Sequence, residues 1–483
     1  MRKKLYIIMP LLVILLLTAT SGRDDDYIDE PMRHTLSVLA PGHFAPSIRR
    51  AAENMAAAWE ADDTNRIFEL ELSTYNINDS IGRVNAANRL VTMLAAGEGY
   101  DMFFSGMHPV SQFARQGYLT NIYTLIDLDP FMHPWASTGG RDDFYLQPLR
   151  AMEIGGRLYS FPLSFGFYNI TVNAALPDAF VAGFTTRDIM CLGELMRMYV
   201  ELITLYPEYD EMHFISGFTA NYLQFYMNNF IDHNGRTADF TNSGFVDFLE
   251  NLRIISARPE EQGAGHVFPM HAQDSMRRAG NHVFHVHHSF LSPAFAFIDT
   301  NYLTNGAENF VGARQITDTQ GRLVLSTSPF GSQGTWAMLS FPSAGNSILA
   351  WEFTQHLISE FSQPTGSLSA NASNRGWGGY SMATPIAREL FVPHVTPVFQ
   401  RVNRYRQYFG QLLRSDADIM RPETFDRILA RIGTLNEMPM SYVNRDIPLS
   451  LFWGDFSGFM DGDITADELA RRMQAEVLIW FAE

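Results

Sequence analysis

Residues 88–104 read NRLVTMLAAGEGYDMFF, and this stretch decides the fold. Its first half has apolar residues at helical spacing, a pattern that starts near Ile81 and is stopped by Gly97 and Gly99. Its second half is a short apolar run of the kind found in buried strands. The stretch therefore predicts a helix over 81–96 followed directly by a strand over 100–104.

The preceding residues repeat the same alternation. The segment 35–40 is an apolar run ended by Pro41, and 47–62 has helical apolar spacing with Ser47 as its candidate N-cap. The segment 68–74 alternates apolar and polar residues, as a half-buried strand does. The order strand, helix, strand, helix, strand predicts a parallel sheet with helices on both faces. Ligands bind such sheets beyond the carboxyl ends of the strands.

A second set of α/β elements follows Gly155 and Gly156. Near the end of the chain, Thr465 and Glu468 have the spacing of a capping box, which predicts a helix start there. The expected elements between these points are a strand over 168–173, helices over 186–206, 243–256 and 348–361, and a strand over 282–287.

Length and charge limit the function classes. A chain of 483 residues exceeds what one hydrophobic core usually supports, so two domains are expected. The formal net charge of -17 argues against nucleic acid or anionic lipid as the main partner. The single cysteine, Cys191, excludes an internal disulfide and a cysteine-rich zinc site, and its apolar surroundings predict a buried core residue.

The N-terminus has the layout of an export signal. A basic start at 2–4 precedes an apolar run over 5–17 and then small and polar residues, so we assign 1–22 to the signal and 23–33 to an acidic tether. The run is short for a membrane span of ~20 residues. Thr20 stands where a bacterial lipoprotein has its lipidated cysteine. The signal is therefore lipoprotein-like without the acceptor, which leaves both a cleaved, secreted form and a membrane-associated form open.

Four groups of motifs occur in one order along the chain. They are 88–104 with 114–122, 156–162 with 168–173, 240–253, and 350–353 with 462–474. Together they resemble the extracellular solute-binding protein family of ATP-driven (ABC) importers, family 1, in the branch that contains the maltose-binding protein.

The resemblance implies an α/β fold of the two-lobed periplasmic-binding-protein type (type II). Each lobe is then a mostly parallel sheet flanked by helices, and the lobes are joined by a hinge that the chain crosses several times. The crossings are expected near 163–167, 336–339 and 384–386. The implied limits are 34–163 plus 338–385 for the N-terminal lobe and 164–337 plus 386–483 for the C-terminal lobe.

The resemblance also implies a function. The protein would be extracytoplasmic and monomeric, without a cofactor, and not an enzyme. It would capture a small organic solute, with a carbohydrate or oligosaccharide as the expected class, and deliver it to an ABC permease. Matched positions and the aromatic content of 13% give these ligand candidates: His43, Phe44, Phe104, Ser105, His108, Tyr222, Tyr226, Ser289, Phe290, Trp377, Tyr380 and Trp453.

Two other functions remain open at this stage. His282, His285, His287 and His288 lie close together, and imidazole is a common metal ligand, so a zinc-capture protein is conceivable. A secreted carbohydrate-active enzyme is the other alternative, although none of the common hydrolase or phosphate-binding motifs occurs. We expect no metal site, because no acidic residue or cysteine stands beside the histidines.

Overall fold

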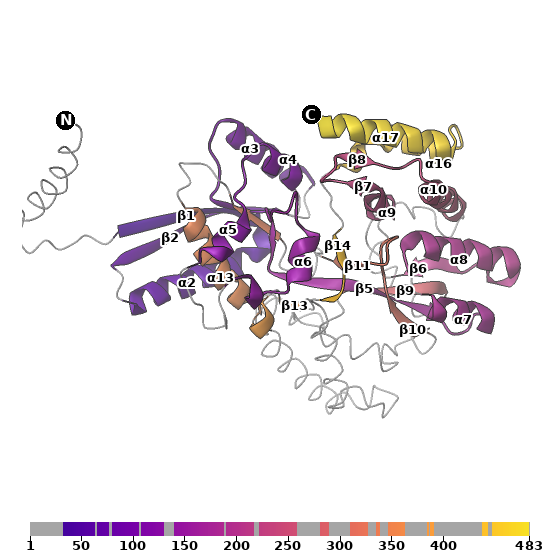
Figure 1. The fold of residues 1–483 in the computed structure, drawn as a ribbon, viewed down its shortest axis with the longest axis horizontal. Coiled ribbons are helices and arrows are strands. Elements are labelled where there is room, and N and C mark those ends of the chain that lie inside the picture. Colours follow the sequence, from indigo (N-terminus) through magenta and orange to yellow (C-terminus); the bar gives the residue numbers. More distant parts are fainter. Residues whose placement is uncertain are drawn as a thin grey trace, which may run out of the picture.

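Two β-sheets lie one after the other along the long axis of the molecule, each with its own helices (Figure 1). The computed structural model describes residues 32–62, 65–76, 80–105, 108–129, 140–187, 190–216, 222–257, 281–288, 310–326, 335–338, 346–362, 384–385, 387–390, 437–442 and 447–482. The predicted export signal lies outside these residues.

The first sheet has the strand order β2-β1-β3-β12-β4. Strand β1 is parallel to β2 and β3, whereas β12 is antiparallel to both β3 and β4. The predicted strand, helix, strand, helix, strand order of the first lobe is confirmed. The elements are β1 (Met32–Pro41), α2 (Ala45–Ala61), β2 (Arg66–Tyr75), α3 (Ser80–Ala95), β3 (Met102–Phe104), β4 (Phe161–Pro162) and β12 (Thr335–Met338).

Helix α2 covers the first sheet together with α13 (Ser347–Ser362). It buries Ile48, Met55 and Trp59, which recur at the spacing of one helical face. The predicted cap at Ser47 is wrong: the helix already begins at Ala45, after a 3-10 turn, and Ser47 is buried inside its first turn. Short helices α4 (Val110–Arg115), α5 (Ile122–Asp127) and α6 (Leu146–Ala151) complete this lobe.

The second sheet has the strand order β14-β11-β5-β9-β6, and β10 and β13 also pair with β5. Strand β5 is antiparallel to β9, and β6 is parallel to β9. The strands are β5 (Ser164–Asn173), β6 (His213–Ser216), β9 (His282–His288), β10 (Phe310–Gln315), β11 (Leu323–Ser326), β13 (Thr384–Pro385) and β14 (Met440–Tyr442).

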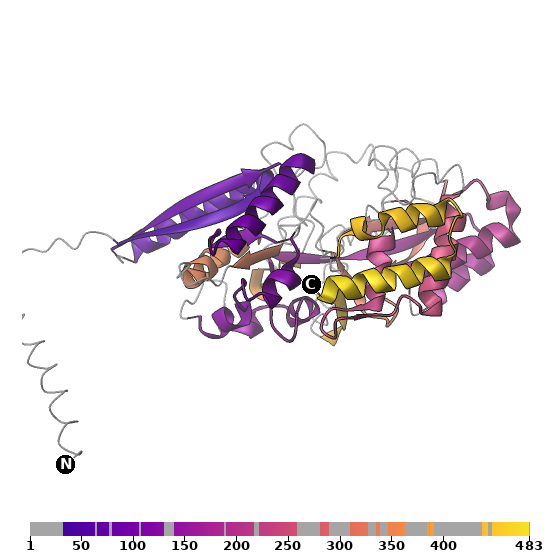
Figure 2. The ribbon, with the colours of Figure 1, turned by 90° about the horizontal axis from the view of Figure 1, so that it is seen from above.

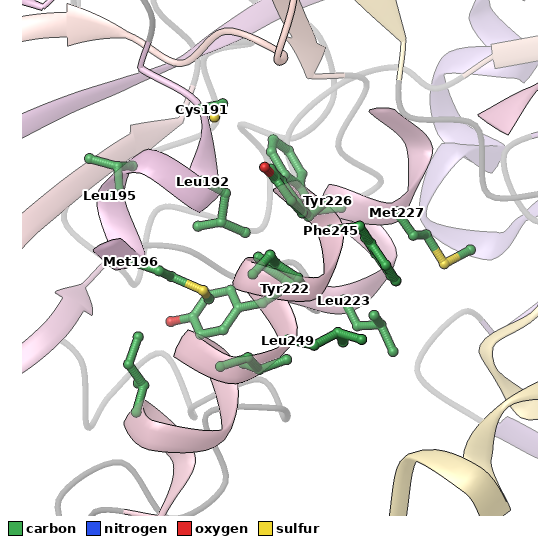
Figure 3. Close-up of a cluster of buried hydrophobic side chains, with 14 of the residues drawn as sticks. Cys191, Leu192, Leu195, Met196, Tyr222, Leu223, Tyr226, Met227, Phe245 and Leu249 are labelled. Carbon is green, nitrogen blue, oxygen red and sulfur yellow. The ribbon is translucent and has the colours of Figure 1, made fainter. Parts of the chain in front are cut away.

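The helices of the second lobe enclose a core rich in aromatic residues, part of which Figure 3 shows. The single helix expected over 186–206 is wrong, because one helix ends at Thr186 and the next begins at Leu192. Helix α10 has the predicted bounds. The helices are α7 (Asp178–Thr186), α8 (Leu192–Leu205), α9 (Tyr222–Met227), α10 (Ser243–Ser256), α16 (Trp453–Met460) and α17 (Ala466–Ala482).

The C-terminal helix α17 packs against α10 and α16, as the view from above shows (Figure 2). The backbone N–H of Glu468 donates to Oγ1 of Thr465 at 3.2 Å, so the predicted start of this helix is confirmed. Among the described residues, no helix combines the length and the apolar character that a membrane crossing requires.

The chain passes from the first sheet to the second between Pro162 of β4 and Ser164 of β5. Strand β12 belongs to the first sheet although it follows β11 of the second. Strand β13 pairs with β5, and Ala387 just after it bridges Phe144 of the first lobe. These passages lie near the expected crossings, while the exact lobe limits stay a prediction.

Candidate functional site

The carboxyl edge of the first sheet faces the second lobe. Strands β1 and β3 are parallel, with Leu39 paired to Phe103. Because β12 is antiparallel to both β3 and β4, strand β4 runs in the same direction as β3. The carboxyl end of β4 leads through Leu163 into β5 of the second sheet. Figure 1 shows the same direction, since β1 runs from the outer end of the molecule towards its centre.

The carboxyl edge of the second sheet faces the first lobe. Strand β5 starts at the crossing and runs away from the first lobe, so β9, antiparallel to it, runs back towards that lobe. Strand β6 is parallel to β9 and ends at the same edge. His288, the last residue of β9, lies level with Tyr168 on β5. The carboxyl edges of the two sheets therefore face each other. Ligands of α/β proteins bind at such edges.

The first-lobe edge carries two of the predicted polar residues close to the strand ends. His43 lies in the 3-10 turn that follows β1, and its side chain is exposed. Burial of part of the imidazole lowers the pKa of His43. Ser105 follows β3, and its Oγ lies 2.5 Å from Oγ of Ser160, where either hydroxyl can be the donor. Both serines are buried.

His108 is the most unusual group at this edge. Its side chain is only 6% exposed and packs edge-on against Phe103, with ring centroids 5.2 Å apart. Burial lowers the pKa of His108 to about 4, so the imidazole is neutral at pH 7. Its Nδ1 makes no hydrogen bond within the described part of the chain. A buried polar atom in that state costs free energy unless a ligand or water supplies a partner.

The aromatic candidates of the first lobe lie beneath this edge. Phe44 and Phe104 are both buried, and their rings lie 5.5 Å apart in the core of the lobe. Of the polar candidates, His43 contacts Phe44, with ring centroids 4.0 Å apart.

The second-lobe candidates are not brought together with these residues. Tyr222 and Tyr226 are buried in the aromatic core of that lobe (Figure 3). Trp453 begins α16, is 47% exposed and lies 6.3 Å from the ring of Phe456. Four candidates fall outside the described residues, namely Ser289, Phe290, Trp377 and Tyr380.

The histidine cluster forms part of β9. His282 and His285 are buried in the sheet, and the ring of His282 lies 5.0 Å from that of His213 on the neighbouring strand. Within the ranges that the structure describes, no three histidine, cysteine or carboxylate side chains gather as a metal site requires.

Ser160 is the residue of this edge that sequence reasoning missed. It precedes the Phe161-Pro162 pair, and only its contact with Ser105 reveals its place. Hydroxyl groups, a neutral imidazole and supporting aromatic rings suit the binding of an uncharged polar molecule.

Comparison with known proteins identifies the fold. No family model and no curated protein matches the chain. Solved structures do match. A proposed oligosaccharide periplasmic-binding protein from Synechococcus sp. MITs9220, in complex with zinc, is 12% identical with a TM-score of 0.52, covering 92% of this chain and 99% of that one.

An extracellular solute-binding protein, family 1, from Alicyclobacillus acidocaldarius is also 12% identical, with a TM-score of 0.51. The match covers 94% of this chain and 100% of that one. Both matches therefore align nearly the whole length of this chain with nearly the whole length of the other protein. The order of helices and strands in this chain agrees with the fold that the sequence motifs imply. The chain has the two-lobed, periplasmic-binding-protein-like α/β fold of the extracellular solute-binding proteins.

Proposed function

We propose that this protein is an extracytoplasmic solute-binding protein that captures a carbohydrate, an oligosaccharide in particular, between its two lobes. The observation that carries the proposal is the pair of carboxyl edges that face each other across the start of β5. The bound form then delivers the solute to the permease of an ABC importer. The solved structures with the same fold include one described as an oligosaccharide-binding protein, which supports this class of ligand.

The chemistry of the first-lobe edge supports an uncharged, hydroxyl-rich ligand. Ser105 and Ser160 supply hydroxyls, and the buried His108 adds an imidazole that is neutral at pH 7. None of these three groups carries a charge at pH 7. A charged solute would lack a counter-charge there, whereas sugar hydroxyls both donate and accept hydrogen bonds.

From the second lobe we propose Trp453 as a stacking residue, because its exposed indole offers an apolar face to a sugar ring. The proposed contact set is His43, Ser105, His108 and Trp453. Phe44 and Phe104 are buried in the core of the first lobe, and Tyr222 and Tyr226 are buried in the core of the second. Ser289, Phe290, Trp377 and Tyr380 stay predictions. The protein binds its ligand without converting it, and it acts as a monomer.

A ligand screen tests the function. The chain from about Asp24 onward is mixed with oligosaccharides, peptides, polyamines and zinc, and thermal unfolding is followed. A ligand at about 100 times its Kd adds about 2.7 kcal/mol to the free energy of unfolding. We expect stabilisation by one class of sugar and recovery of that sugar unchanged by mass spectrometry. Stabilisation by zinc or peptides alone, or cleavage of the sugar, would contradict the proposal.

Trp453→Ala then tests the proposed contact. Loss of the stacking surface is expected to weaken sugar binding about tenfold, which corresponds to about 1.4 kcal/mol. The matched control is Leu451→Ala, which removes another exposed apolar side chain two positions away. Equal affinities of the two variants in isothermal titration would remove Trp453 from the site.

A further inference from the structure

A cavity of about 740 Å³ lies in the second lobe. Four segments line it: the first turns of α8; the stretch from Tyr226 at the end of α9 through the hairpin of β7 (Ile231–Asp232) and β8 (Thr237–Ala238); the start of α10; and the turn at 319–322. All its lining residues belong to the second lobe, so the cavity is separate from the edge that carries Ser105 and His108. Its volume falls in the range of about 300–1,000 Å³ that small-molecule sites have.

The floor of the cavity is aromatic and tightly packed. Tyr226 stacks on Phe248 with ring centroids 4.2 Å apart and meets Phe230 edge-on at 5.4 Å. The hydroxyl of Tyr226 contacts the thiol of Cys191, and a Cβ on Gly193 would lie 2.4 Å from the same hydroxyl. Figure 3 shows Tyr226 and Cys191 approaching each other from α9 and the start of α8. The floor is therefore already formed before any ligand binds.

The walls of the cavity carry a surplus of negative charge. Glu194 pairs with both Arg187 and Arg197, which leaves one positive charge in excess, and Arg322 pairs with Asp318. Three further carboxylates, those of the exposed Asp232, Asp239 and Asp247, have no basic partner among the described residues, so two negative charges remain in excess. Asp232 accepts a hydrogen bond from the backbone N–H of Asn234, and Asp239 accepts one from Nδ2 of Asn242. The cavity thus attracts a positively charged group.

Amide groups stand among these carboxylates. Asn251 lies one helical turn after Asp247, and both line the cavity. The Nδ2 of Asn228, which also lines the cavity, donates to the backbone oxygen of Gln224 at 2.8 Å, and its Oδ1 is an acceptor. Amide groups that both donate and accept are matched by hydroxyl groups on a ligand.

We propose that this cavity binds a small organic amine that carries hydroxyl groups, the chemistry of an amino sugar. The ammonium group lies among the carboxylates of Asp232, Asp239 and Asp247, and the hydroxyls bond to the amides. The apolar face of the ligand rests on the half-buried ring of Phe230. The site is a second one, independent of the solute site between the lobes.

Titration of the whole mature chain with glucosamine, glucose and N-acetylglucosamine tests the ligand class. The three probes share a ring and most hydroxyls, but only glucosamine carries an ammonium group. We expect saturable binding of glucosamine at least about tenfold tighter than that of the two uncharged sugars, weakened by added salt. Equal binding of all three, or no saturable binding of glucosamine, would overturn the proposal.

Variants locate the binding. Asp247→Asn keeps the shape of the wall and removes one charge, so glucosamine affinity is expected to fall about fivefold to tenfold. Glu201→Gln, an exposed acidic residue on α8 that does not line the cavity, is the matched control and is expected to bind as the wild type does. Asn251→Trp fills the cavity and is expected to abolish binding.

The proposed solute site and the proposed amine site can be refuted independently of each other. Loss of glucosamine binding in Trp453→Ala but not in Asp247→Asn would place the amine between the lobes and refute the second site. Loss of oligosaccharide binding in Trp453→Ala with intact glucosamine binding supports both proposals. If Asn251→Trp does not fold, Asp247→Asn and its control still decide the question.

Discussion

The backbone N–H of Gly155 in the first lobe donates a hydrogen bond of 2.6 Å to Oδ1 of Asn234, at the tip of the second lobe's β7–β8 hairpin. A second contact joins the lobes nearby, since the guanidinium of Arg115 lies 5.2 Å from the ring centroid of Trp480 on α17. Both contacts lie outside the strands that cross between the lobes. They therefore stabilise the particular arrangement of the lobes seen here.

Asn234→Ala is expected to reduce the population of this arrangement. A single hydrogen bond contributes about 0.5–1.5 kcal/mol, so the equilibrium between lobe arrangements shifts by up to about tenfold. Fluorescence energy transfer between dyes on the two lobes measures the shift. Arg49→Ala, an exposed change on α2, is the control. Identical transfer efficiencies in the variant and the wild type would show that this contact has no role in setting the arrangement.

Glu352 is predicted to stabilise the first lobe. Its Oε1 accepts a 2.5 Å hydrogen bond from Nε1 of Trp59, and Arg66 stacks 3.5 Å above the Trp59 ring while pairing with the same carboxylate. Glu352→Ala leaves a buried donor and a partly buried cation without their acceptor. We expect a loss of about 2–3 kcal/mol in the free energy of unfolding, measured in urea.

Two comparisons sharpen that prediction. Glu352→Gln keeps an oxygen for Trp59 and should lose less than Glu352→Ala. Glu53→Ala, an exposed residue on α2, should lose almost nothing. If Glu53→Ala and Glu352→Ala cost the same, the network does not contribute to stability.

His108 is expected to make the first lobe sensitive to acid. Its folded pKa of about 4 lies below the usual 6.5, so between these values the unfolded chain takes up a proton that the folded chain does not. Stability therefore falls as pH decreases. The wild type should lose about 2 kcal/mol from this group between about pH 7 and pH 5. His108→Asn should lack that component in urea titrations at the two pH values, and unchanged acid sensitivity would contradict the assignment.

Gly193 is predicted to tolerate no side chain. A Cβ there would stand 2.4 Å from Oη and 2.7 Å from Cζ of Tyr226, so Gly193→Ala must displace a buried ring. We expect a loss of about 1–3 kcal/mol in thermal unfolding. The matched control is Gly183→Ala in α7, where nothing lies within 4 Å of the new Cβ and the helix gains up to about 1 kcal/mol. Stabilisation by both substitutions would be the contrary result.

The pattern of apolar and polar residues predicts the first five elements of the first lobe, from β1 to β3. The run at 35–40 predicts β1 and the glycines after α3 predict the end of that helix, because local pattern and burial agree there. Strand β3 begins at Met102, two residues after the predicted start. The predicted start of α2 is wrong because Ser47 has the chemistry of an N-cap but lies inside the helix. The 3-10 turn after Pro41 leads directly into α2, which begins at Ala45. The break between α7 and α8 was missed for a similar reason, because apolar spacing continues on both sides of it.

Little of the site could be predicted from residue patterns alone. The pairing of Ser105 with Ser160, and of Trp59 with Glu352, depends on segments that are distant in sequence. A single sequence carries no signal for such contacts. The cavity beside Tyr226 is a further case, because its lining comes from four separate segments and its aromatic floor looks like ordinary core.

The position of β12 has a consequence for how the chain folds. This strand lies between β3 and β4 in the first sheet, yet it is synthesised after most of the second sheet. Until it arrives, β4 has no neighbour in its own sheet, and the first lobe cannot close its core. Because such distant pairings are slow to form, the nascent chain should remain incompletely folded until late in synthesis. Such a delay suits the extracytoplasmic location that we propose, because a chain crosses a membrane through a translocation channel before it folds.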